Sequence, residues 1–97
     1  MSTEQPPAEF DLDRAWQLSR QVAIRPERFG ALLYHFGTRR LSFLKNPTLL
    51  AAVRALAEQP TARAACLNAG VEPAELPRYR AALAALATSR TIEPRSL

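Results

Sequence analysis

The chain has 97 residues and a mass of 10.7 kDa, which is enough for one small domain with one shared hydrophobic core. Its composition, 47% hydrophobic and 23% charged, excludes wholesale disorder and a disulfide scaffold. The net charge of +4 is unevenly spread: residues 1–13 carry four acids and no base, which leaves the remainder with 13 bases, five acids and a net charge of +8. Such a field favours an anionic partner, whether nucleic acid, membrane surface or acidic peptide.

The N-terminal residues 1–9 are polar and contain prolines, so we expect a disordered tail ahead of a domain that spans residues 10–93. This segment lacks the basic region and the apolar run of a secretory signal, and no stretch approaches about 18 uninterrupted apolar residues. We therefore expect a cytoplasmic protein with no membrane segment. Residues 94–97 are expected to form a C-terminal tail.

The first half of the domain has the pattern of a sheet. Residues 10–16 fit either a short strand or a helical turn, and we expect them to cover exposed sheet surface. Val22–Ile24 predicts a first strand that Pro26 ends, because proline lacks the N–H donor of a ladder. Residues 31–36 are apolar at both odd- and even-numbered positions, which predicts a central strand covered on both faces.

Residues 39–45 predict a third antiparallel strand, with Leu41 and Phe43 on one face and Arg40, Ser42 and Leu44 on the other. We expect the Phe43 side chain to lie in the core. Adjacent residues of a strand point their N–H groups toward opposite edges, and the sequence leaves open which of the two sets faces the free edge.

Beyond Lys45 the helical period takes over. Asn46 is an N-cap followed by proline, and it predicts a helix from residue 47 to about 58. A second helix is expected at 62–69, ending on Gly70, and a third begins no later than Pro77 and continues to Ser89. The core stripe of the third helix is predicted to be Leu76, Tyr79, Leu83 and Leu86. The fold class is α+β: an N-terminal three-stranded antiparallel sheet followed by a three-helix bundle.

The chain lacks the residues of an obvious catalytic or metal site. His35 is the single histidine and is interpreted as a core or sheet-surface histidine with one satisfied nitrogen. Cys66 is the single cysteine and is interpreted as a buried apolar residue. The carboxylates form no acid-base pair, and no phosphate-binding loop is present. We therefore expect a binding module that is not an enzyme and has no cofactor and no bound metal.

Two runs carry a family resemblance. Val22–Glu27 and Phe29–Lys45 closely resemble the peptide chaperones of mycofactocin systems, which are PqqD-like precursor-peptide recognition elements. The resemblance covers about residues 10–93 and implies a winged-helix-like arrangement of the sheet and helices.

The resemblance implies a non-catalytic domain that binds a ribosomally synthesised precursor peptide and presents it to a radical S-adenosylmethionine maturase. In that family the leader adds as an extra strand beside the third strand and lies against the third helix. An acidic leader is implied, and basic residues of the site would steer it. The peptide-binding residues implied here are Arg40, Leu41, Ser42, Phe43, Leu44, Lys45, Arg78, Arg80 and Ala81.

The main alternative is a winged-helix DNA-binding protein, which the basic domain and the architecture favour. Against it, the start of the third helix offers only Arg78 and Arg80 as base-reaching side chains, followed by an alanine-rich body. Nucleic acid is therefore not the expected partner. A plain structural subunit is the other alternative.

Overall fold

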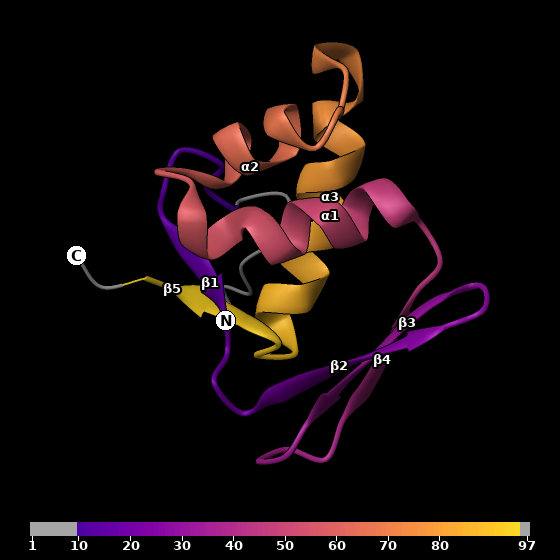
Figure 1. The fold of residues 1–97 in the computed structure, drawn as a ribbon. Helices are drawn as coiled ribbons and strands as arrows, with labels where there is room; N and C mark the ends of the chain where they lie inside the picture. Colours follow the sequence, from indigo (N-terminus) through magenta and orange to yellow (C-terminus); the bar gives the residue numbers. More distant parts are fainter. Residues whose placement is uncertain (1–9, 96–97) are drawn as a thin grey trace, which may run out of the picture.

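The structure, a computed structural model, describes residues 10–95, and the expected tail of residues 1–9 lies outside this range. Three helices lie on one side of a three-stranded sheet, with α1 (Pro47–Ala55) next to the sheet and α2 (Ala62–Asn68) farther from it, and a two-stranded sheet joins the two ends of the described chain (Figure 1). The α+β class, with a three-stranded antiparallel sheet and three helices, is confirmed. No helix within the described range is both long and apolar enough to cross a membrane.

Strands β2 (Val22–Glu27), β3 (Gly30–His35) and β4 (Leu41–Leu44) form the larger sheet, with β3 in the centre. Gly30 begins β3 with a φ of 153°, and a Cβ atom at this position would run into the carbonyl oxygen of Leu44. Glycine therefore allows β4 to lie close to β3 at this corner of the sheet.

Pro26 lies inside β2, opposite Ala31, so the expectation that it ends the strand is wrong. The Phe36 N–H donates to the Gln21 carbonyl over 2.7 Å, and bonded and non-bonded pairs alternate along an antiparallel ladder. This alternation turns the nitrogen of Pro26 away from β3. Because β2 is an edge strand, the missing N–H costs no ladder bond.

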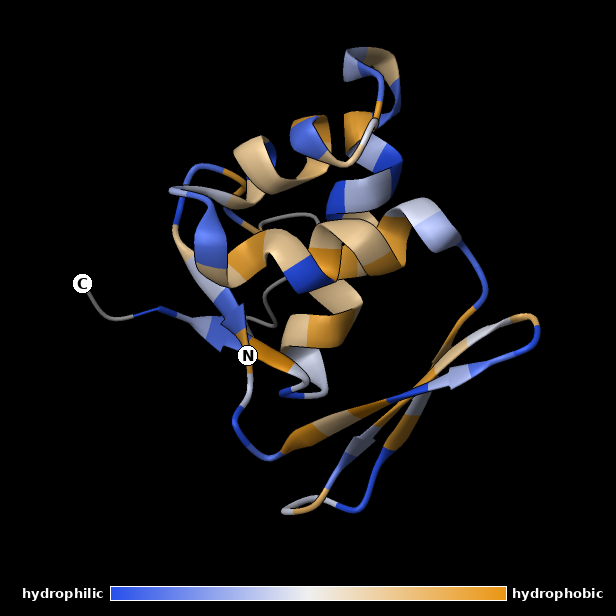
Figure 2. Cartoon of the chain, viewed as in Figure 1, coloured by the Kyte–Doolittle hydropathy of each residue, from blue (hydrophilic) through white to orange (hydrophobic). Residues whose placement is uncertain are grey.

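The larger sheet is covered on one face only within the described residues. Along β3, Ala31, Leu33 and His35 are buried, whereas Leu32 and Tyr34 are only half-buried. The expectation of a central strand covered on both faces is therefore wrong, because the helices occupy a single side of the sheet (Figure 1). Figure 2 shows hydrophobic colouring along these strands as well as along the helices. Leu32 and Tyr34 lie on the uncovered face, which is why β3 is apolar at both its odd- and its even-numbered positions.

The helices follow the sequence prediction closely. They are α1 (Pro47–Ala55), continued by the 3₁₀ turn η2 (Leu56–Glu58), then α2 (Ala62–Asn68), the 3₁₀ turn η3 (Pro73–Glu75) and α3 (Leu76–Thr88). Asn46 Oδ1 accepts the N–H groups of Thr48 and Leu49, as expected of an N-cap. Gly70 follows α2 with a φ of 104°. The four residues of the predicted α3 stripe are all buried.

Two short strands, β1 (Trp16–Leu18) and β5 (Ile92–Pro94), pair antiparallel and are absent from the sequence prediction. Pro94 pairs opposite Trp16, so this residue of the expected tail belongs to the fold, and residues 96–97 of that tail lie outside the described range. The segment ahead of β1 packs on the helices rather than over the sheet: the Arg63 N–H donates to the Leu12 carbonyl over 2.8 Å. Pairing across such a distance in the sequence leaves no local pattern that would predict it.

Candidate functional site

A single main-chain bond establishes which way β4 faces. The His35 N–H donates to the Arg40 carbonyl over 2.9 Å, and these two residues lie opposite each other when the printed register is continued by one residue. They therefore form a hydrogen-bonded pair, and such pairs recur at every second residue of an antiparallel ladder. The main-chain groups of Ser42 and Leu44 consequently point toward β3.

Leu41 and Phe43 have the opposite orientation: their N–H and C=O groups point away from β3, toward the outer edge of β4. β4 is an edge strand, and within residues 10–95 no other strand pairs with that edge. The structure thus answers the question that the sequence leaves open. The odd-numbered residues of β4 present the unpaired main-chain groups, in a form that an extended chain can bind.

The other edge of the sheet, on β2, is less able to accept a strand. The outward positions of β2 include Pro26, which has no N–H, and Val22, whose N–H donates to the Ser19 carbonyl over 3.0 Å. Arg25 and Glu27 form an exposed ion pair on the same strand, with 3.2 Å between Nε and Oε2. Proline and charge are common ways of protecting an edge strand, so β4 is the better candidate for strand addition.

The side chains of β4 divide as the alternation predicts, but the core assignment of Phe43 is wrong. Phe43 is 44% exposed and Leu41 is 63% exposed, both on the uncovered face of the sheet, whereas Leu44 is buried. The reason is the register: Leu44 lies opposite Ala31, on the face that the helices cover. An exposed aromatic and an exposed leucine thus lie directly beside the free edge.

Helix α3 packs against the start of α1, two residues beyond the end of β4. The Asn46 side-chain amide donates to the Tyr79 hydroxyl over 2.9 Å, and a hollow of about 80 Å³ lies between the start of α1 and α3. Arg78 and Ala82 of α3 line this hollow. The structure therefore places the predicted residue Arg78 beside Asn46, two residues after the end of β4. Sequence reasoning treated Asn46 only as a cap and Tyr79 only as core, and so missed their contact.

The structure does not bring all the predicted helix residues to that place. Arg80 lines a different groove, of about 290 Å³, together with Leu12 and Arg63, and Ala81 is exposed and lines neither hollow. Residues two apart on a helix do not share a face, and this spacing was the available signal. Because Arg78 and Arg80 diverge, α3 also lacks the single basic face of a DNA-recognition helix.

His35 and Cys66 lie in the surroundings that the sequence suggests. His35 is 6% exposed, and its Nδ1 accepts the N–H groups of Gly37 and Thr38 over 3.0 and 3.1 Å. Cys66 is fully buried, and burial raises the pKa of its thiol. Within residues 10–95 no three His, Cys, Asp or Glu side chains group together in a way that would hold a metal ion.

Comparison with known proteins gives consistent matches over most of the chain. A sequence profile of the peptide chaperone MftB family matches residues 15–93. The chain is 60% identical over 85 residues to peptide chaperone MftB of Mycobacterium ulcerans, covering 88% of this chain and 78% of that protein. It is 58% identical over 88 residues to peptide chaperone MftB of Mycobacterium tuberculosis, covering 91% and 81% respectively. The protein of the same name from Mycolicibacterium smegmatis is 53% identical over 85 residues, with 88% and 83% covered. No solved structure matches the chain.

Proposed function

The chain belongs to the peptide chaperone MftB family, and we propose that it binds a ribosomally synthesised precursor peptide of the mycofactocin type by strand addition to β4. The observation that carries this proposal is the pair of outward main-chain positions, Leu41 and Phe43, on an edge strand with no partner within residues 10–95. An extended peptide placed there would continue the order β2, β3, β4 by one further strand.

The strength of such binding suits a carrier. Two outward residues supply two donors and two acceptors, each worth about 1 kcal/mol net, and ordering of the peptide offsets part of this. The exposed side chains of Leu41 and Phe43 add apolar contact on the uncovered face. The result is reversible capture, as expected of a protein that has to pass the peptide on.

Positive charge surrounds the proposed strand site. Arg40 precedes β4, Lys45 follows it, both are exposed, and Arg78 lies across the hollow on α3. Charges arranged in this way attract an acidic segment and accelerate its encounter with the site. We propose an acidic leader as the segment that binds, with Arg80 and Ala81 outside the main contact.

We further propose that the chain is not a catalyst and that it presents the bound peptide to a radical S-adenosylmethionine maturase. The support for this step is the family resemblance of the Phe29–Lys45 run. A small open reading frame and a gene for such an enzyme beside this gene would support the assignment. Their absence would return attention to the alternative of a structural subunit.

Amide hydrogen exchange tests strand addition directly. The probe is a peptide selected from a display library of about 12 random residues on the immobilised protein. In the free protein the N–H groups of Leu41 and Phe43 should exchange fast, and those of Ser42 and Leu44 slowly, because only the latter are in the ladder. Peptide should protect Leu41 and Phe43. Binding without added protection at these two positions contradicts strand addition.

A further inference from the structure

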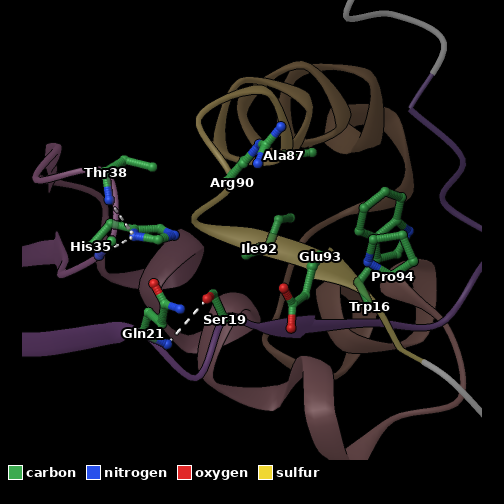
Figure 3. A pocket seen from close by; sticks show the side chains of 11 residues that line it. Trp16, Ser19, Gln21, His35, Thr38, Ala87, Arg90, Ile92, Glu93 and Pro94 are labelled. Carbon is green, nitrogen blue, oxygen red and sulfur yellow. Dashed lines mark hydrogen bonds between the residues drawn. The ribbon is translucent and has the colours of Figure 1, made fainter.

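A cavity lies away from the β4 edge. It has a volume of about 630 Å³ and lies between the end of the β3–β4 hairpin, the segment between β1 and β2, and the C-terminal end of α3 with β5. Its lining includes Trp16, Gln21, His35, Thr38, Arg90 and Glu93. Figure 3 shows these side chains arriving from all three parts of the fold.

His35 presents an unused hydrogen-bond donor to this cavity. Its Nδ1 accepts two main-chain N–H groups of the hairpin, so the proton of the neutral ring is on Nε2. His35 is 6% exposed, and within residues 10–95 its Nε2 has no hydrogen-bond partner. Figure 3 shows this nitrogen turned away from the hairpin, toward the interior of the cavity. Within the described residues no buried side-chain nitrogen or oxygen lacks a hydrogen-bond partner, so this unpartnered nitrogen is accessible from the open space of the cavity. Its N–H can therefore donate to an acceptor that enters the cavity.

Arg90 supplies a positive charge to the same cavity from an unfavourable backbone conformation. It follows α3 with a φ of 64°, in the left-handed region where glycine is the favoured residue. The position closes the helix: the Arg90 N–H donates to the Ala87 carbonyl over 3.0 Å, and the Thr91 N–H to the Leu86 carbonyl over 2.8 Å. This conformation fixes where the Arg90 side chain leaves the end of α3, at the wall of the cavity.

The rest of the lining indicates what kind of group fits. Trp16 and Ile92 provide apolar wall, and Glu93 provides an acceptor whose Oε2 already binds the Gln17 amide over 3.1 Å. A free inorganic anion would meet the Glu93 carboxylate as well as the two donors. A peptide segment matches better, because an acidic side chain can bind His35 and Arg90 while main-chain N–H groups face Glu93.

We infer that this cavity is a subsite for an acidic side chain of the bound peptide, held by the Nε2–H of His35 and the guanidinium of Arg90. The inference rests on the proposed function and goes beyond it, because it names a contact outside the β4 edge. A peptide on β4 can reach the cavity: α3 begins near Asn46, which follows β4, and Arg90 follows the other end of this helix. The 13 residues of α3 make a helix about 20 Å long, which about six extended residues span.

A double-mutant cycle tests the subsite. The probes are the display-selected peptide and versions in which each Asp or Glu is replaced singly by its amide. The protein variants are Arg90→Gly, which also relieves the backbone, and Arg39→Gly as the matched control, because Arg39 has the same φ of 64° and does not line the cavity. Arg90→Gly should raise the thermal unfolding midpoint and weaken peptide binding about tenfold. Arg39→Gly should raise the midpoint and leave the affinity near that of the parent.

At one acidic position of the peptide, replacement by the amide should weaken binding to the parent protein but should not weaken binding to the Arg90→Gly variant. His35→Asn should weaken the same peptide and show the same dependence, because Asn Oδ1 can replace Nδ1 at the hairpin while the Nε2 donor is lost. If the losses of binding free energy from the protein substitution and from the peptide substitution add at every acidic position, the subsite is wrong. Strand addition would be unaffected by that result. Failure to select any binding peptide would overturn the proposed function and this inference with it.

Discussion

The side-chain amide of Asn46 donates to the hydroxyl of Tyr79 over 2.9 Å, and this bond joins the start of α1 to the first turns of α3. The same side chain caps α1 through its Oδ1 atom. One asparagine therefore caps α1 and ties the start of that helix to α3, two residues after β4 ends. The hollow that Arg78 lines lies at this contact.

Removal of the hydroxyl from Tyr79 should cost about 0.5–1.5 kcal/mol of stability, because one largely buried hydrogen bond is lost. Asn46→Ala should cost about 1 kcal/mol more, since it also removes the helix cap. Urea unfolding of Tyr79→Phe and Asn46→Ala measures both. Tyr34→Phe is the control, because its hydroxyl forms no hydrogen bond within residues 10–95; an equal loss there would mean that the Asn46 contact contributes nothing.

Phe43→Pro should abolish peptide binding while the domain stays folded, because the lost N–H points to the free edge. Phe43→Ala is the matched control: it removes the aromatic ring but keeps the N–H, and should weaken binding only in part. Fluorescence anisotropy with a labelled selected peptide measures the affinities, and circular dichroism reports folding. Equal affinities of the two variants would argue against a main-chain contact at Phe43.

Ser42→Pro should have the opposite outcome. Its N–H lies in the ladder with β3, so proline should remove a hydrogen bond within the sheet and destabilise the domain by about 3 kcal/mol or more. Chemical denaturation of this variant beside Phe43→Pro gives the comparison. A Ser42→Pro protein as stable as Phe43→Pro would show that the inferred orientation of β4 is reversed.

Arg78→Glu should slow peptide association and reduce its dependence on salt, because Arg78 lines the hollow at Asn46, just after β4. Arg80→Glu is the matched control from the same helix, since Arg80 lines a different groove. Stopped-flow association rates at low and high ionic strength distinguish the two. An exposed charge is worth only about 0–1 kcal/mol, so the effect on the rate should be several-fold at most. Equal slowing by both variants would indicate general attraction by the basic domain.

Gly30→Ala should destabilise the domain severely, because the added methyl group would run into the main chain of β4 at Leu44. Gly70→Ala provides the control: its φ of 104° is also unfavourable for alanine, but no atom lies within 4 Å of the added Cβ. Its cost should be about 1 kcal/mol. Thermal unfolding measures both, and a similar small loss at Gly30 would show that β4 can move away without penalty.

The ion pair of Asp13 and Arg63 should give a small acid-sensitive contribution to stability. Arg63 Nε donates to Asp13 Oδ1 over 2.8 Å and lowers the pKa of that carboxyl below its usual value of 3.8. A lowered folded-state pKa stabilises the native protein above the unfolded value, and the contribution is lost as the pH falls through the folded value. Asp13→Asn should therefore be slightly less stable than the parent at neutral pH and equal to it in strong acid. A constant difference across the range would exclude this ionisation as the cause.

The sequence by itself determined the features that depend on neighbouring residues. The change from period two to period 3.6 near Asn46 predicted the order of sheet and helices, and the caps at Asn46 and Gly70 predicted helix ends. The buried stripe of α3 followed from its spacing. All of these are local, because a helix satisfies its main chain within one turn and its apolar stripe repeats along the sequence.

Only the tertiary structure decided which face of each strand is buried and which edge of the sheet is free to bind a peptide. The alternation of side chains along a strand predicts that Leu41 and Phe43 share a face. It does not predict that this face is uncovered or that the N–H groups of these residues point to the free edge. Those facts depend on the register with β3 and on where the helices pack. The pairing of β1 with β5 joins residues 76 positions apart, Gln17 and Glu93, through strands too short to have a pattern. The cavity that holds His35 and Arg90 exists only after that pairing closes the fold, because contacts distant in sequence leave no periodic trace.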